Sequence, residues 1–196
     1  MLLGVAVALG GRRAYRFYAS GAVTIDSGVG RRVRALGPVT WEIAADRETV
    51  FEVIASPYLG KTPRSMKDSL HVWERGRDMV LAAHYTKVKC GVTSTVETVQ
   101  FERPDRINFR LVRGPVPHVR ESFVLKAADR GSTLTWEGEL GTDFGELGVL
   151  WGNVVARSWE KAVRSSMKAI ITEAERRSGA DAKCAAPPNV GSHTPG

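Results

Sequence analysis

Two glutamates that share a strand face with large apolar residues are the side chains whose placement most suggests chemistry. In the stretch VETVQFERPDRINFRL, Glu97 alternates with Val99 and Phe101, and further along Glu121 alternates with Phe123. Because alternate residues of a strand point to the same face, both carboxylates are predicted on the apolar side of a sheet. A carboxylate there must be paired, hydrogen-bonded or protonated, and it can accept hydrogen bonds from a ligand or act as a general acid or base.

The predicted pairing of four strands brings the two glutamates into one row across the sheet. A turn at 103–105 pairs Glu97 with Leu111, and matching of apolar faces across a loop at 114–118 pairs Leu111 with Glu121. The next hairpin pairs Glu121 with Gly138. The two neighbouring rows hold Phe101, Ile107, Leu125 and Leu134, and Val99, Phe109, Phe123 and Trp136. Since two acids and a glycine replace bulky apolar groups, this row is expected to line a cavity or its mouth.

Two basic side chains are the further catalytic candidates. Arg113 is predicted one row beyond the glutamates, together with Thr95, Val119 and Leu140. His84 faces inward beside Thr95 or outward, because the turn at 89–91 allows two registers. The structural alternative stays open: Glu97 and Glu121 can simply pair with Arg113, His84, Tyr85 or a water, or lie solvated at the open end of the sheet.

Other kinds of site find little support. No two histidines have the spacing of metal ligands, so no metal is expected. The chain lacks a phosphate-binding loop, a nucleophile elbow and a dinucleotide fingerprint, so no cofactor is expected either.

The elements that position these residues follow from periodicity and turn residues. A strand at 39–45 leads into a helix that Asp46 caps and Pro57 stops, followed by a second short helix or turn. Six strands within 70–140, joined by short turns, predict an antiparallel meander. A long helix follows, with Asp143 and Glu146 as a capping box and an end near Arg177. Its expected apolar side comprises Leu147, Leu150, Trp151, Val154, Val155, Trp159, Val163, Ile170 and Ala174.

This order of elements, with the stretches ETVFEVIASPY, FERPDRINFRLV and GSTLTWEGEL, resembles the START-like or SRPBCC superfamily, which includes Bet v 1-like proteins and bacterial polyketide cyclase/dehydrase proteins. The resemblance covers about Val39 to Arg177. It implies an α+β helix-grip fold, in which a curved antiparallel sheet of about seven strands wraps around the long C-terminal helix, with two short helices after the first strand. It also implies a cavity between sheet and helix for a lipid or another apolar molecule. The expected ligand-binding residues are Val99, Phe109, Leu111, Phe123, Trp136, Gly138, Trp151 and Val155.

Composition and the chain ends set the remaining expectations. With 28 Lys and Arg against 21 Asp and Glu, the chain is basic, yet no nucleic-acid-binding motif accompanies the charge, so no nucleic acid is expected. Two distant cysteines predict no disulfide and a cytoplasmic location. Residues 1–38 form a leader whose apolar start and basic, aromatic continuation allow peripheral membrane contact. Residues 178–196 are expected to be a disordered tail.

Three functions remain open from the sequence. The first is a carrier or sensor of an apolar small molecule or lipid, held between the sheet and the long helix. The second is an enzyme of the cyclase or dehydratase type that moves protons with Glu97, Glu121, Arg113 or His84. The third is an interaction protein held at a membrane by its leader. The sequence leaves the oligomeric state undetermined.

Overall fold

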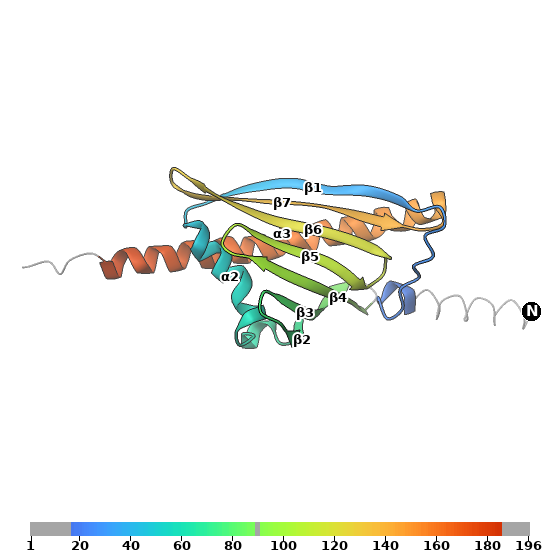
Figure 1. The fold of residues 1–196 in the computed structure, drawn as a ribbon, viewed down its shortest axis with the longest axis horizontal. Helices are drawn as coiled ribbons and strands as arrows, with labels where there is room; N and C mark the ends of the chain where they lie inside the picture. The colour runs from blue at the N-terminus through green and yellow to red at the C-terminus, as the bar shows by residue number, and fades with distance from the viewer. Residues whose placement is uncertain (1–16, 89–90, 186–196) are drawn as a thin grey trace, which may run out of the picture.

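A single curved antiparallel sheet carries the two glutamates and packs against a long C-terminal helix in the computed structural model, which describes residues 17–88 and 91–185 (Figure 1). The strands are β1 (Arg32–Ile43), β2 (Leu70–Arg75), β3 (Met79–Val88), β4 (Gly91–Glu102), β5 (Arg106–Arg113), β6 (His118–Ala128) and β7 (Gly131–Thr142). The helices are α2 (Arg47–Leu59), the short 3-10 helix η1 (Arg64–Met66) and α3 (Gly145–Ala185). The predicted α+β helix-grip fold is confirmed.

The sheet follows the predicted meander, with β1 added at the far edge. Its strand order is β1-β7-β6-β5-β4-β3-β2, and every pair is antiparallel. Along β5 and β6 buried and more exposed residues alternate, because one face packs on the helices and the other faces solvent. The concave face therefore holds the core.

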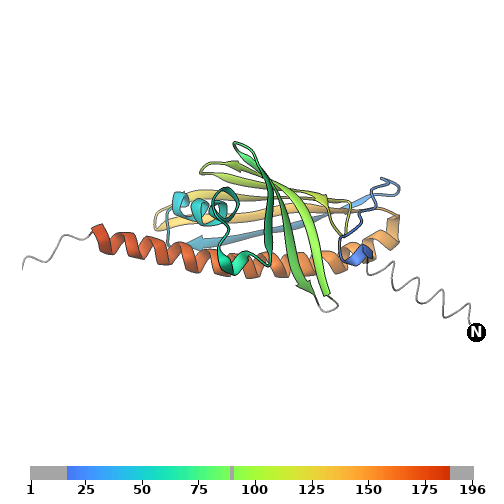
Figure 2. The ribbon, with the colours of Figure 1, turned by 90° about the horizontal axis from the view of Figure 1, so that it is seen from below.

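Helix α3 lies along the concave face of the sheet and continues past one end of it (Figure 2). It contacts β1 and β7, while α2 packs on α3 and β6. The buried side of α3 comprises Val155, Ala156, Val163, Met167 and Ala174. None of the helices in the described part of the chain is long and apolar enough to cross a membrane.

Three of the residues predicted on the apolar side of α3 are exposed instead. Leu147, Leu150 and Val154 have exposed fractions of 75%, 65% and 50%. They follow one another at spacings of three and four. So do the buried and half-buried residues Val155, Trp159, Val163, Met167, Ile170 and Ala174, but the two stripes lie on opposite sides of the helix. Apolar spacing alone did not say which stripe faces the sheet.

Helix α2 begins as predicted and ends later. The Asp46 carboxylate accepts a hydrogen bond from the Thr49 backbone N–H at 2.7 Å, which confirms the N-cap. Pro57 does not stop the helix, which continues to Leu59. Because Pro57 lies within the last turn, its missing N–H removes one helical hydrogen bond, and the Gly60 N–H still reaches the Ser56 carbonyl at 2.9 Å.

The predicted boundaries of leader and tail fall inside regular elements. Strand β1 begins at Arg32 instead of Val39, because the pairing with β7 continues beyond Gly37 and Pro38 through a register shift. Helix α3 continues beyond Arg177 to Ala185. The start of the leader, residues 1–16, and the end of the tail, residues 186–196, lie outside the described residues.

The predicted capping box of α3 is wrong, because Asp143 binds a distant loop. Its Oδ2 accepts hydrogen bonds from the backbone N–H groups of Ser27 and Gly28 at 2.7 and 2.9 Å. Its Oδ1 accepts one from Arg31 Nε at 2.8 Å, and this partner holds the pKa of the buried carboxyl well below its usual range. The hydrogen bonds of Asp143 therefore connect the segment before β1 with the end of β7.

The register of two hairpins is as predicted. Strands β4 and β5 pair Glu97 with Leu111 and Val99 with Phe109. Strands β6 and β7 pair Glu121 with Gly138.

The register between β5 and β6 differs from the prediction by two residues. Phe109, not Leu111, lies opposite Glu121, and Ile107 lies opposite Phe123. A slip of two residues leaves every side chain on its face, so matching of apolar faces could not separate the two registers. The loop after β5 also folds inward and buries Val116 completely, instead of forming a simple five-residue connection. Glu97 and Glu121 thus stand in neighbouring rows, not in one row.

Candidate functional site

Glu121 lies at the centre of the interior, between the sheet and α3. The residue is 7% exposed. Its Oε2 accepts hydrogen bonds at 2.8 Å from the indole N–H groups of Trp136 on β7 and Trp159 on α3. Burial, and next the charge of Glu97, raise the pKa of Glu121 to about 7, although the two indole bonds oppose this rise. Near neutral pH this carboxyl is therefore present both as an acid and as a base.

Glu97 is the second buried carboxylate, and it is held by its own strand. It is 5% exposed, and its Oε1 accepts a hydrogen bond from the Thr95 hydroxyl at 2.7 Å. Its Oε2 lies 3.8 Å from Nε2 of His84, which pairs with Thr95 across β3 and β4. His84 thus faces inward, the first of its two predicted orientations. Its buried Nε2 has no hydrogen-bond partner among the described residues.

Tyr58 completes this cluster, although it is not among the site residues predicted from the sequence. The residue is 7% exposed on α2, with its ring centroid 5.8 Å from that of His84. Burial raises the pKa of the Tyr58 hydroxyl, and the charges of Glu97 and Glu121 raise it further, so the phenol stays protonated. The sequence feature that could have indicated Tyr58 is its position four residues after Ile54, which places both residues on the buried side of α2. We call Glu97, Glu121, His84 and Tyr58 the acid cluster.

Arg113 is not part of the acid cluster. A register shift between Val96 and Glu97 places Arg113 opposite Val96, and its guanidinium lies 5.9 Å from the ring centroid of Trp73. Within the described residues it forms no ion pair with Glu97 or Glu121, and its buried Nε has no hydrogen-bond partner. Of the partners considered for the two glutamates, Arg113 is therefore not one that the structure brings to them. Their compensation comes from indole and hydroxyl donors, which carry no charge.

Most of the predicted ligand-binding residues are buried in the core. Those that are less than a tenth exposed are Val99, Phe109, Leu111, Phe123, Trp136 and Val155. Trp151 is half-buried and donates its indole N–H to the Pro115 carbonyl at 2.7 Å. Gly138 does not leave open space beside Glu121, because a Cβ there would lie 2.4 Å from the Arg120 carbonyl oxygen and 2.8 Å from the Glu121 Cβ. The glycine permits close approach of β6 and β7.

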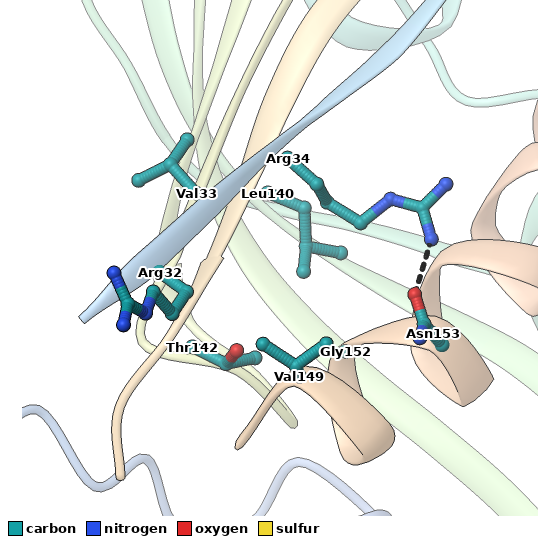
Figure 3. A pocket seen from close by; sticks show the side chains of 8 residues that line it. All are labelled: Arg32, Val33, Arg34, Leu140, Thr142, Val149, Gly152 and Asn153. Atoms are coloured by element: carbon teal, nitrogen blue, oxygen red, sulfur yellow. Dashed lines mark hydrogen bonds between the residues drawn. The ribbon is translucent and has the colours of Figure 1, made fainter. Parts of the chain in front are cut away.

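A pocket of about 160 Å³ lies elsewhere, between the start of β1, the end of β7 and the first turns of α3 (Figure 3). Its lining residues are Arg32, Val33, Arg34, Leu140, Thr142, Val149, Gly152 and Asn153. One wall is closed by a hydrogen bond at 2.7 Å from Arg34 Nη1 to Asn153 Oδ1. None of the predicted site residues lines it.

The acid cluster offers hydrogen-bonding and proton-transfer chemistry in an apolar setting. Glu121 can exchange a proton near neutral pH, Tyr58 can donate a hydrogen bond, and His84 has an unused ring nitrogen. Across the described residues, no three His, Cys, Asp or Glu side chains are grouped to hold a metal ion.

Comparisons with known proteins agree with this architecture. Residues 38–175 match the family described as "Polyketide cyclase / dehydrase and lipid transport". No curated protein matches the chain.

Among solved structures, Zhui aromatase/cyclase from a Streptomyces species is similar, with a TM-score of 0.58 and 17% identity over 75% of this chain and 95% of that one. The di-domain ARO/CYC BexL from the BE-7585A biosynthetic pathway has a TM-score of 0.53 and 18% identity, over 81% of this chain and 52% of that one. Ara h 8.0201 has a TM-score of 0.51 and 10% identity, over 77% and 98%. At these identities the structures support the fold alone. The family match spans most of the sequence, and the chain therefore belongs to the polyketide cyclase/dehydrase and lipid transport family.

Proposed function

We propose that this domain binds an apolar small molecule or a lipid between the concave face of the sheet and α3, with the polar end of the ligand at the acid cluster. The family description, which joins polyketide chemistry with lipid transport, supports an apolar ligand. The observation that carries the proposal is Glu121, a buried carboxylate bound by one indole from the sheet and one from α3.

A buried acid is costly to a fold unless something compensates for it. Replacing Glu121 and its donors by apolar side chains would avoid the cost of burying a carboxylate, which is several kcal/mol when the group is poorly compensated. A binding site gives a reason to keep such a group, because strongly perturbed acids gather at functional sites. The unused Nε2 of His84 adds a second group that a ligand hydroxyl or carbonyl could meet.

Native mass spectrometry of the purified protein is the direct test. An apolar molecule that co-purifies would support binding, and its mass would give the class of ligand. A brominated stearic acid then serves as a defined probe, since bromine quenches the fluorescence of a neighbouring indole. Quenching should shrink in Trp159→Phe and stay unchanged in Trp73→Phe, whose side chain is exposed on β2. Equal quenching in both variants, or no saturable quenching, would contradict binding at the acid cluster.

The second candidate is a cyclase or dehydratase, and the raised pKa of Glu121 favours it. A group whose pKa is about 7 both takes and returns a proton efficiently at neutral pH. In such an enzyme Glu121 would remove a proton from an acidic carbon of a folded poly-carbonyl substrate, while Tyr58 donates a hydrogen bond to the developing oxyanion.

Glu97→Gln and Glu121→Gln separate the two candidates. Turnover of a synthetic poly-carbonyl thioester should collapse if the domain is an enzyme, because the proton acceptor is lost. A carrier has no turnover to lose, and its affinity for the brominated probe would change modestly. Glu137→Gln, on an exposed side chain of β7, controls for the loss of one charge.

A further inference from the structure

The side of α3 that faces away from the sheet carries an ordered, exposed stripe. Seven residues form this outer stripe: Leu147, Leu150, Val154, Arg157, Lys161, Arg164 and Lys168. They follow one another at spacings of three and four, which keeps them on one side of a helix, and all of them are exposed. At 1.5 Å per residue the stripe is roughly 30 Å long. It lies opposite the buried side of α3, so no element of the described chain covers it.

The first part of the outer stripe is apolar. Leu147, Leu150 and Val154 are at least half exposed, and Phe144, just before the helix, is 51% exposed. Val29, which is 65% exposed, joins this end because its carbonyl accepts the Phe144 backbone N–H at 2.7 Å. Large apolar side chains gathered at one end of a molecule mark an interaction site more often than isolated ones do.

The second part of the outer stripe is basic. Arg157, Lys161, Arg164 and Lys168 form no ion pair with any described residue, so their charges are free to attract a partner. The only acid in the sequence between Leu147 and Lys168 is Glu160, whose carboxylate lies 3.6 Å from an Arg34 nitrogen. The stripe therefore presents uncompensated positive charge beside apolar surface.

The described chain begins at the same end of α3. Phe17, the first described residue, is 62% exposed, and the ring of Tyr18 lies 5.5 Å from that of Trp151. The sixteen residues before it read MLLGVAVALGGRRAYR, an apolar run followed by cations. Their composition repeats that of the outer stripe.

We propose that the outer stripe is a docking surface for an anionic lipid bilayer. Helix α3 lies parallel to the membrane, its apolar first turns enter the interface, and its cations lie over the lipid headgroups. A bilayer is favoured over a protein partner because the surface combines unpaired cations with exposed aliphatic and aromatic side chains. The adjoining residues 1–16 also combine apolar residues with cations. The inference goes beyond the proposed ligand site, which lies on the opposite side of α3.

Co-sedimentation of the full chain with vesicles tests this. Vesicles of phosphatidylcholine with phosphatidylglycerol should bind the protein, and vesicles of phosphatidylcholine alone should bind it much more weakly. Lys161→Gln with Lys168→Gln should weaken binding about thirtyfold, because each substitution removes the usual contribution of one cation to the free energy of binding at an anionic surface. Leu147→Gln with Leu150→Gln should weaken it about tenfold or more, and these exposed positions tolerate the change without unfolding.

A matched control removes the same charge from another face. Arg110→Gln with Arg120→Gln alters two exposed, paired strand residues on the convex side of the sheet, and it should change vesicle binding by less than about threefold. Circular dichroism confirms that each variant is folded.

Four results would overturn the proposal. The first is the absence of binding to anionic vesicles, and the second is equal loss in the control and the stripe variants, which would mean non-specific attraction. The third is a concentration-dependent dimer in sedimentation velocity that the Leu147→Gln, Leu150→Gln variant dissolves, because the stripe would then bind a second copy. Loss of binding in Val5→Asp with Val7→Asp while the stripe variants bind normally would assign the contact to the chain start alone and also contradict the proposal.

Discussion

Replacing Glu121 by glutamine should change how the free energy of unfolding depends on pH. Burial and the charge of Glu97 raise the pKa of Glu121 to about 7 in the folded protein. In the unfolded chain a glutamate titrates near about 4.3. The folded protein therefore holds this proton more tightly than the unfolded chain does, and protonation stabilises the fold.

The size of the effect follows from these two pKa values. Below about pH 4 the carboxyl is protonated in both states, and its favourable contribution is fully present. As the pH rises from about 4 to about 7, the unfolded chain loses the proton first, and the fold loses stability. At 1.36 kcal/mol per pH unit the total loss is about 4 kcal/mol. Glutamine cannot titrate, so the Glu121→Gln variant lacks this loss.

The measurement compares unfolding in urea for the wild type and the variant at several values between about pH 4 and pH 9. Far-ultraviolet circular dichroism is the suitable signal, because indole fluorescence would also respond to the changed contacts of Trp136 and Trp159. Titrating groups that do not interact with Glu121 are shared, so they cancel in the difference between the two proteins. Glu137→Gln, on the exposed side of β7, serves as the control and should give a difference that stays flat.

The free energy of unfolding of the variant minus that of the wild type should rise by about 4 kcal/mol from the acid to the alkaline end of the series. A difference that stays constant within about 1 kcal/mol would show that Glu121 titrates alike in the folded and unfolded states. The interior would then solvate this carboxylate well, and the reasoning that links it to proton exchange at neutral pH would fail.

Three further substitutions test contacts around the site and the chain start. Asp143→Asn removes the buried one of the two anions that pair with Arg31, the other being Asp26, and should lower the free energy of unfolding by about 3 kcal/mol at pH 7. The deficit should shrink as the pH falls below about 4, because the pKa of Asp143 is depressed in the fold. Gly138→Ala places a methyl group against β6 and should cost about 1 to 3 kcal/mol in urea unfolding, whereas an unchanged midpoint would refute the close approach. Trp159→Phe removes one donor from Glu121 and should move the midpoint of its pH-dependent stability above about 7, so a downward shift would contradict the role of that bond.

Local turn geometry explains which parts of the sheet were predictable. The turns between β4 and β5 and between β6 and β7 are short, so the position of the turn residues determines the register of both hairpins. The connection between β5 and β6 contains Pro115 and Pro117 around the fully buried Val116. A loop that packs into the core is controlled by tertiary contacts, which no pairing rule within the sequence describes.

The partners of the two glutamates were predictable to different degrees. Thr95 and His84 lie on the same strand as Glu97 or on its neighbour. His84 is among the partners expected from the sequence, whereas Thr95 is expected only in the neighbouring row. Trp159 and Tyr58 reach the acid cluster from helices that are distant in the sequence, and helical spacing indicates only that such residues are buried. The same limit explains why the exposed leucines of α3 were predicted to be buried.

The positions of the two acids indicate how ligand binding and proton transfer would be connected. Glu97 receives its hydrogen bond from its own strand, so movement of α3 leaves that bond intact. Glu121 is bound from both layers, so a ligand that entered between β7 and α3 would separate the Trp159 indole from Oε2. Removing that donor raises the pKa of Glu121 further above about 7 and so favours proton uptake at neutral pH. Because the protonated carboxyl is itself a hydrogen-bond donor, ligand entry would convert Glu121 from an acceptor of indole N–H groups into a donor to a carbonyl oxygen. A carrier would use this conversion to hold a carbonyl or carboxyl end, and an enzyme would use the same proton for catalysis.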